Sequence, residues 1–248
     1  MDDGIGRLTL NRPASLNTFT PGMTWAIIEA TERLRDDSEV KLVVLSGAGR
    51  AFCTGADFNI LDANRHRPEE IARFNRGINY ALNAIEALPQ PVIGSVHGHA
   101  LGGGLEAMLV CDIVVAAKST IIGDPHVEVS FPHGGGGSQR LPRRIGLARA
   151  LDLALTCRRL TASAAMETGL VARVAPDAEL TDTVDLIARE MAERNGATLR
   201  EVKRLLHLSM RVDLSVGLQA EETAFAAHAR RPDAFVGIDA FLARRARK

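Results

Sequence analysis

The chain has 248 residues, of which 46% are hydrophobic and 24% are charged, and its 30 basic and 30 acidic side chains give a formal net charge of zero. A chain of this length and composition can bury a large core, which argues against an intrinsically disordered protein. The zero net charge provides no overall basic field that would draw the protein to nucleic acid or to a membrane surface.

The three cysteines, Cys53, Cys111 and Cys157, lie far apart and form no C-x-x-C pair. An odd number of cysteines at such spacing argues against a disulfide framework or a zinc finger and is typical of a reducing compartment. The first residues lack the basic segment and the following apolar segment of a signal peptide. No apolar run reaches the roughly 18 residues needed to span a bilayer. We therefore expect a cytoplasmic protein that binds neither membrane nor nucleic acid.

Four strand-like segments alternate with helix-like segments in the first half of the chain. The strand-like segments are residues 5–10, 40–46, 92–97 and 112–117. Thr20 and Pro21 are typical of an N-cap followed by proline in the first helical turn, and residues 105–110 predict another helix. The 40–46 segment is almost continuously hydrophobic, as in a strand covered on both faces. This alternation predicts an α/β protein with parallel strands.

Helical patterns rich in Ala, Leu, Arg and Glu dominate the chain from about residue 140 onward, and residues 171–176 are a strand-like exception. The helical segments are residues 145–156, 161–168, 180–195, 198–210, 217–230 and 235–246. We divide the chain into a core of residues 1–185, which would hold the functional site, and a C-terminal helical region of residues 186–248.

Two turns with small residues offer backbone N–H groups that could bind an anionic oxygen. In residues 50–58, Gly55 and Ala56 follow a strand and let a ligand approach the backbone, with the N–H of Ala56 as a donor. In residues 99–106, three glycines open a helix whose first N–H groups have no partner within the helix and lie at the positive end of its dipole. Two such donors from separate strand ends suit the oxyanion of an acyl group.

Other patterns indicate packing rather than a site. The glycine run at 134–137 lacks the lysine and serine or threonine of a P-loop, and we interpret it as a close-packed turn. His97 and His99 could share one face of a strand, but no acidic residue has ligand spacing beside the histidines, so no metal site is predicted. Cys53 is interpreted as a packing residue.

The sequence resembles the enoyl-CoA hydratase/isomerase, or crotonase, superfamily in six segments that follow the family's order. These are LTLNRPASLN (8–17), GAGRAFCTGADF (47–58), GHALGGGLEAMLVCDIVVAA (98–117), GDPHVEVSFPHGGGGSQRLPRRIG (123–146), ALTCRRLTASAAMETGLVARV (154–174) and GIDAFLARRARK (237–248). The resemblance implies a spiral of ββα units that holds two nearly perpendicular sheets, followed by C-terminal helices that mediate trimer formation. It also implies an acyl-CoA substrate, no separate cofactor because coenzyme A is part of the substrate, and a homotrimer or a hexamer made of two trimers.

The resemblance carries over residue by residue. Ala56 and Gly103 match the residues whose N–H groups hold the thioester oxygen, and Glu106 matches the first of two catalytic glutamates in the hydratases. Phe225 and Arg244 match residues that reach the coenzyme A of a neighbouring subunit. The other expected contacts with coenzyme A and substrate are Ala14, Ser15, Leu16, Gly55, Asp57, Phe58 and Gly102.

The chain departs from the hydratases at the second catalytic glutamate. In the family this glutamate follows a proline, whereas Pro125 is followed by His126. Some members that cleave carbon–carbon bonds have histidine here and pair it with an aspartate, but this chain has glycine at the position of that aspartate, 135. Asp124 and Glu128 are near enough to orient His126 or to replace the missing carboxylate, and His133 is a further candidate.

The leading hypothesis is hydration of a 2-trans-enoyl-CoA to a 3-hydroxyacyl-CoA, with Glu106, His126, Ala56 and Gly103 as the catalytic residues. A first alternative is double-bond isomerisation or hydrolytic carbon–carbon cleavage with His126. A second is a non-catalytic acyl-CoA-binding protein, in which Glu106 would only complement the helix N-terminus. The histidine also predicts weak hydration of crotonyl-CoA and a preference for another reaction or a bulkier acyl group.

Overall fold

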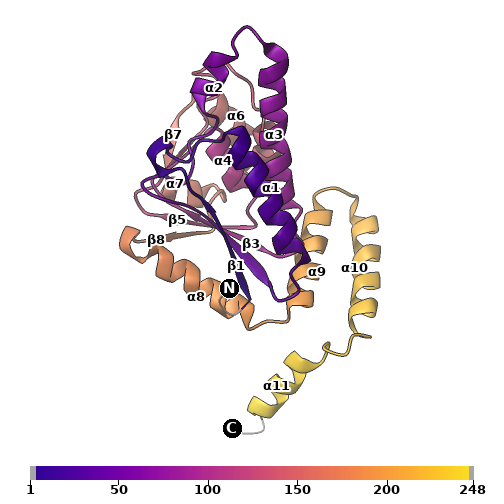
Figure 1. Cartoon of the computed structure of the whole chain (residues 1–248). Coiled ribbons are helices and arrows are strands. Elements are labelled where there is room, and N and C mark those ends of the chain that lie inside the picture. The colour runs from indigo at the N-terminus through magenta and orange to yellow at the C-terminus, as the bar shows by residue number, and fades with distance from the viewer. Residues whose placement is uncertain (1–3, 246–248) are drawn as a thin grey trace.

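The computed structural model in Figure 1 describes residues 4–245. Residues 1–3 and 246–248, at the outer ends of the two expected regions and of the last resembling segment, lie outside the described residues. The main sheet has five strands in the order β1-β2-β3-β5-β8, and all neighbouring strands are parallel, as expected. These strands are β1 (Ile5–Leu10), β2 (Leu42–Gly47), β3 (Val92–Val96), β5 (Ile113–Ala117) and β8 (Arg173–Ala175).

A second sheet has the order β4-β6-β7, with β4 and β6 parallel and β6 and β7 antiparallel. Its strands are β4 (His99–Leu101), β6 (Ile121–Gly123) and β7 (Arg159–Thr161). Helical elements surround the two sheets. They are η1 (Pro13–Ser15), α1 (Pro21–Asp36), α2 (Phe58–Ala63), α3 (Pro68–Glu86), α4 (Gly103–Leu109), α5 (Gly137–Ile145), α6 (Leu147–Thr156), α7 (Ala162–Glu167), η2 (Asp177–Glu179), α8 (Leu180–Ala192), α9 (Gly196–Ser209), α10 (Leu214–His228) and α11 (Val236–Arg245).

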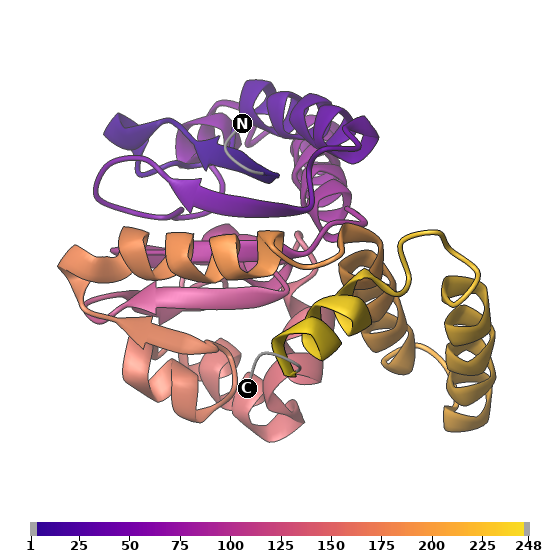
Figure 2. The ribbon, with the colours of Figure 1, turned by 90° about the horizontal axis from the view of Figure 1, so that it is seen from below.

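The main sheet is buried on both faces, as the 40–46 segment predicts. Val43 and Leu45 of β2 belong to the large core cluster that also contains the buried residues of α3 and α4. Leu42 and Val44 point to the other face, where they pack in a cluster with the buried side of α8. Figure 2 shows α8 running across this face of the sheet. The alternation along β2 therefore places one helix layer on each side.

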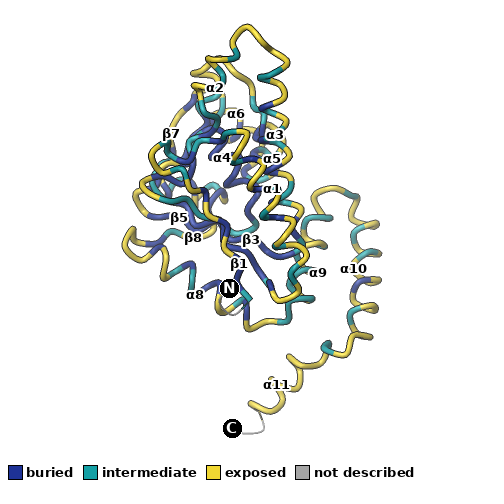
Figure 3. Tube along the Cα trace, viewed as in Figure 1, coloured by how far each residue is buried: buried dark blue, intermediate teal, exposed yellow. Residues whose placement is uncertain are grey.

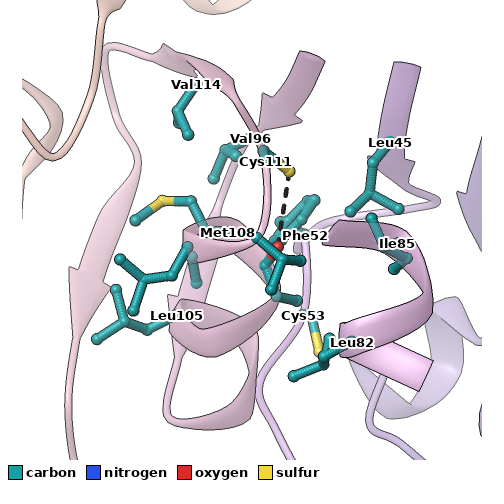
Figure 4. Close-up of a cluster of buried hydrophobic side chains, with 14 of the residues drawn as sticks. Leu45, Phe52, Cys53, Leu82, Ile85, Val96, Leu105, Met108, Cys111 and Val114 are labelled. Carbon is teal, nitrogen blue, oxygen red and sulfur yellow. Dashed lines mark hydrogen bonds between the residues drawn. The ribbon is translucent and has the colours of Figure 1, made fainter. Parts of the chain in front are cut away.

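Helix α4 occupies the centre of the molecule, and all of its residues are buried. Leu105 and Met108 point into the apolar cluster drawn in Figure 4, together with side chains from the strands and from α3. A Cβ atom added at Gly104 would lie 1.9 Å from the carbonyl oxygen of Cys53. Because the helix start packs directly on the backbone of the 50–58 segment, only a glycine fits there.

Helix α3 is a long element that was not predicted from the sequence. Its buried residues are Phe74, Ile78, Ala81, Leu82 and Ile85, which follow the helical spacing of one apolar face. This helix packs along α1 and forms a wall of the cavity described below.

The C-terminal helices α9, α10 and α11 extend away from the sheets (Figures 1 and 2), and α10 and α11 are largely exposed in Figure 3. A partly buried ionic contact fixes α9 to the body, since Lys203 and His207 both bind Asp112, at 2.8 and 2.7 Å. The expected boundary at residue 185 lies within α8 and stays a prediction. Between residues 4 and 245, no helix is both long and apolar enough to cross a membrane.

Candidate functional site

Ala56 lies in a turn, and the residues on either side of it, Gly55 and Asp57, form backbone hydrogen bonds with Phe19. The amide of Phe19 donates to the carbonyl oxygen of Gly55 at 2.7 Å, and the amide of Asp57 donates to the carbonyl oxygen of Phe19 at 3.1 Å. In a parallel bridge of this kind the residue between these two groups directs its own N–H away from the partner strand. The N–H of Ala56 is therefore left for a group on the opposite side, where Ala56 lines a cavity.

Gly103 is the first residue of α4, so its N–H has no acceptor within the helix. It lies against the Ala56 turn. A Cβ atom added at Gly55 would be 2.9 Å from the amide nitrogen of Gly103, and one added at Gly103 would be 2.9 Å from the Cα of Gly55. Glycine at both positions lets the two turns touch. The N–H groups of Ala56 and Gly103 are consequently close neighbours at the wall of one cavity.

This cavity has a volume of about 310 Å³ and brings together residues from distant parts of the chain. Glu106, His126 and His133 line it together with the two turns. Its remaining wall is mostly apolar and comes from α2, from α3 and from the loop before α5. These apolar residues are Phe58, Leu61, Ile71, Ala72, Phe74, Ile78, Val129, Phe131 and Pro132.

Glu106 is almost completely buried at 2% exposure, and one of its oxygens is anchored by the glycine run before α5. Its Oε1 accepts the amide N–H groups of Gly135 at 2.9 Å and Gly137 at 2.8 Å. A Cβ atom at Gly135 would lie 2.5 Å from Oε2, so the run is the close-packed turn expected from the sequence. The second oxygen, Oε2, lies 3.9 Å from Nε2 of His126. Glu106 thus keeps one carboxylate oxygen available for chemistry.

Asp124 binds both candidate histidines. Its carboxylate is fully buried, and Oδ1 accepts Nδ1–H of His126 at 2.5 Å while Oδ2 accepts Nε2–H of His133. Burial alone would raise the pKa of Asp124, but the hydrogen bonds from His126 and His133 outweigh it and hold that pKa well below its usual range. Because an ionised carboxylate only accepts hydrogen bonds, these two ring nitrogens carry protons. Nε2 of His126 is therefore the nitrogen that faces Glu106.

The surroundings of His133 favour the protonated, positively charged form of its ring. The hydrogen bond to Asp124 raises the pKa of His133, and this effect exceeds the opposing effect of burial. Glu128, the other acidic candidate, instead forms an ion pair with Arg159 at 2.9 Å. Asp124 is thus the partner of His126.

The ligand atoms of Asp124, His126 and His133 lie within 4.8 Å of one another. Each histidine nitrogen already binds its own carboxylate oxygen, so hydrogen bonds account for the position of all three groups. The absence of a metal stays a prediction. Burial raises the pKa of the Cys53 thiol to about 12, which agrees with its interpretation as a packing residue.

The structure also locates the expected coenzyme A contacts. Ala14 and Ser15 lie in η1, and Leu16 follows them. The carbonyl oxygen of Leu16 accepts a hydrogen bond from the amide N–H of Thr54 at 3.2 Å, which joins this segment to the Ala56 turn. Asp57 caps α2. Gly55, Phe58 and Gly102 line the cavity, whereas Ala14, Ser15, Leu16 and Asp57 do not.

Phe225 in α10 and Arg244 in α11 are exposed and do not line the cavity. Their contact with the coenzyme A of a neighbouring subunit stays a prediction.

Several residues of the site had no prediction from the sequence. Asn75 and Asn79 in α3 donate to the carbonyl oxygen of Gly134, at 3.3 and 2.9 Å, and so hold the glycine run against the cavity. Ile71, Ile78 and the two asparagines recur at helical spacing, and this pattern could have identified α3 as a wall of the site.

The anchoring of Glu106 predicts a contrast between two substitutions. In Glu106→Gln the side-chain carbonyl can still accept both glycine N–H groups, so we expect a urea unfolding midpoint near that of the unaltered protein. Glu106→Leu leaves two buried donors without an acceptor, at a cost of roughly 1–3 kcal/mol each. Urea unfolding followed by circular dichroism measures the difference, and equal stability of the two variants would contradict the anchoring role.

Comparisons with known proteins show the family of the chain. The family model described as enoyl-CoA hydratase/isomerase matches residues 1–248. The chain is 33% identical over 245 residues to the 2,3-dehydroadipyl-CoA hydratase of Escherichia coli, covering 96% of this chain and 92% of that protein. It is 34% identical over 248 residues to the mitochondrial methylglutaconyl-CoA hydratase of Rattus norvegicus, covering 98% and 78%.

The crystal structure of an enoyl-CoA hydratase from Bacillus anthracis matches this fold with a TM-score of 0.94 and 33% identity, covering 97% of this chain and 93% of that one. The crotonase-like α/β fold expected from the sequence is therefore confirmed, while the role of its C-terminal helices in trimer formation stays a prediction. The chain belongs to the enoyl-CoA hydratase/isomerase family.

Proposed function

We propose that the protein hydrates 2-trans-enoyl-CoA thioesters to 3-hydroxyacyl-CoA. The observation that carries this proposal is the free oxygen of Glu106, which faces Nε2 of His126 across 3.9 Å inside the cavity of the two backbone donors. A carboxylate oxygen and a ring nitrogen at this separation can share one water molecule. A non-catalytic acyl-CoA-binding protein would have no need for a buried glutamate whose free oxygen faces a histidine nitrogen.

The reaction begins with the thioester oxygen between the N–H groups of Ala56 and Gly103, the proposed oxyanion hole. Glu106 Oε2 takes a proton from water as the water oxygen bonds to C3, and the electrons of the C2=C3 double bond move to the thioester oxygen. The two N–H groups stabilise the resulting enolate. In this proposal the reactive form of His126 carries a proton on both ring nitrogens, so the enolate takes a proton at C2 from Nε2 of His126, and the proton on Glu106 then passes to that nitrogen. The product gains one water, and no cofactor is required because coenzyme A is part of the substrate.

One contact favours a second candidate, hydrolytic carbon–carbon cleavage of a β-dicarbonyl substrate. Related enzymes that cleave such bonds pair their histidine with an aspartate, and here Asp124 supplies an aspartate partner for His126. In this reaction His126 would take a proton from water that attacks the carbonyl carbon, and the oxyanion hole would stabilise the leaving enolate.

The cavity wall supports an apolar acyl group as substrate. Among the described residues, no lysine or arginine lines it, and its wall beyond the turns is formed mainly by aliphatic and aromatic side chains from α3 and the 129–132 loop. A substrate chain ending in a carboxylate would lose its hydration there without gaining a cationic partner.

A panel of thioesters tests the reaction and the substrate class together. We expect hydration with kcat/KM rising from crotonyl-CoA to 2-hexenoyl- and 2-octenoyl-CoA, since each buried methylene contributes about 1–3 kcal/mol, and a lower value for glutaconyl-CoA. Glu106→Gln, as the control, should lower kcat by about 10²–10⁴-fold. Cleavage of β-dicarbonyl thioesters with no hydration of any enoyl-CoA would replace the leading proposal by the second candidate.

We also propose that the chain assembles into homotrimers or hexamers. Large apolar side chains remain exposed on the C-terminal helices, including Leu214 at 77% and Phe225 at 78%, which suits an interface between copies. Light scattering should give three or six times the mass of one chain at micromolar concentration. A stable monomer would contradict both the assembly and the proposed contacts of Phe225 and Arg244. The cytoplasmic location stays a prediction, consistent with three free cysteines.

A further inference from the structure

Asp124, His126 and His133 form a triad in which two histidines share one buried carboxylate. Each oxygen of Asp124 accepts one ring N–H, and the two rings lie with their centroids 4.7 Å apart. In the hydratases that this sequence resembles, position 126 carries glutamate, and the usual motif I-P-G-A-G-G places proline at position 133, where this chain has histidine. Both departures from the family pattern thus meet at one side chain, Asp124.

Two buried carboxyl groups, Asp124 and Glu106, lie beside the two histidines. A buried carboxylate is unfavourable unless a cation or hydrogen bonds offset its charge. The nearby guanidinium of Arg140 binds Glu86 at 2.8 Å and the carbonyl oxygen of Gly135. Among the described residues that face the triad, the two histidines are therefore the groups that can offset the carboxylates.

We infer that His133 is a positioning residue that acts through Asp124 and sets how tightly His126 holds its proton. This inference rests on the proposed function, in which His126 delivers a proton to C2. A positive charge on His133 offsets part of the negative charge of Asp124. The carboxylate then attracts a protonated His126 less strongly. The hydrogen bond that Nδ1–H of His126 donates to Asp124 keeps Nε2 directed at the reacting carbon.

A metal ion on the same three residues is the competing explanation. Ligand bonds of about 2.0 Å to zinc would separate a coordinating nitrogen and oxygen by roughly 3 Å. The Nδ1 of His126 lies 2.5 Å from Oδ1 of Asp124, a distance that fits a hydrogen bond.

The kinetic test compares His133→Gln and His133→Ala with the unaltered enzyme. Glutamine can keep a donor to Asp124 but removes the charge, and alanine removes both. Because His126 must be protonated to act, activity is lost as pH rises. Without the cation at 133, Asp124 holds that proton more tightly, so the alkaline limb of kcat should move to higher pH by about one unit in both variants. In His133→Gln, kcat should fall about tenfold with KM nearly unchanged. His97→Gln, which changes a histidine bound to the carbonyl oxygen of Gly49 outside this cavity, is the matched control.

A stability measurement tests the charge on His133 independently of turnover. The pKa of His133 is raised in the folded protein, so its stabilising contribution is complete below about pH 6.5, the value for an unperturbed histidine, and is lost as pH rises through the higher folded value. The urea midpoint of the unaltered protein should therefore exceed that of His133→Gln most at acidic pH, and the difference should shrink as pH rises.

These results separate the inference from the proposed function. Failure of every enoyl-CoA to react would refute hydration, while the pH-dependent stability difference would still support the charged triad. A difference in midpoint that does not vary with pH, or an unmoved alkaline limb with a uniform loss of kcat, would overturn the inference. So would one equivalent of zinc, found by elemental analysis of the purified protein and lost in His133→Gln.

Discussion

The close contact between the Ala56 turn and the start of α4 is the constraint on which the rest of the site depends. Glycines at 55 and 103 let two backbones touch, and Gly104 continues the contact against the carbonyl oxygen of Cys53. Isolated bridges between Cys53 and Ala100 and between Phe19 and Ala56 fix the register of the same segments. Two N–H groups from distant parts of the chain become neighbours as a result. Their positions are set by backbone packing, so they need no reorganisation when a substrate oxygen arrives.

The acid–base groups are placed by a second layer of contacts around this fixed point. Glu106 follows Gly103 within α4, and the glycine run at 134–137 closes over it and uses one of its oxygens. The asparagines of α3 hold that run in turn. Asp124, directly after β6, receives both histidines. The position of the hydratases' second glutamate thus belongs to a hydrogen-bonded triad in this chain.

Local sequence patterns predicted the elements whose own residues determine them. The N-cap and proline at Thr20 and Pro21, the doubly covered strand at 40–46 and the helix after the three glycines all agree with the structure, with boundaries moved by one or two residues. Helix α3 had no prediction although its apolar stripe is regular. The triad could not be derived from spacing, because His133 reaches Asp124 only after the 127–131 segment turns back, with Ser130 in the left-handed region. Contacts between such distant positions depend on tertiary packing.

The oxyanion hole is the central claim, and one pair of variants tests it most directly. Gly103→Ala and Gly103→Pro both add a Cβ atom near Gly55, but only proline removes the N–H, and the first position of a helix tolerates proline. The measurement is kcat for the preferred enoyl-CoA in both variants, with folding verified by circular dichroism. We predict that kcat in Gly103→Pro falls about 10²–10³-fold below that in Gly103→Ala. Equal turnover in the two folded variants would contradict the account, because the enolate would then be stabilised without the Gly103 N–H.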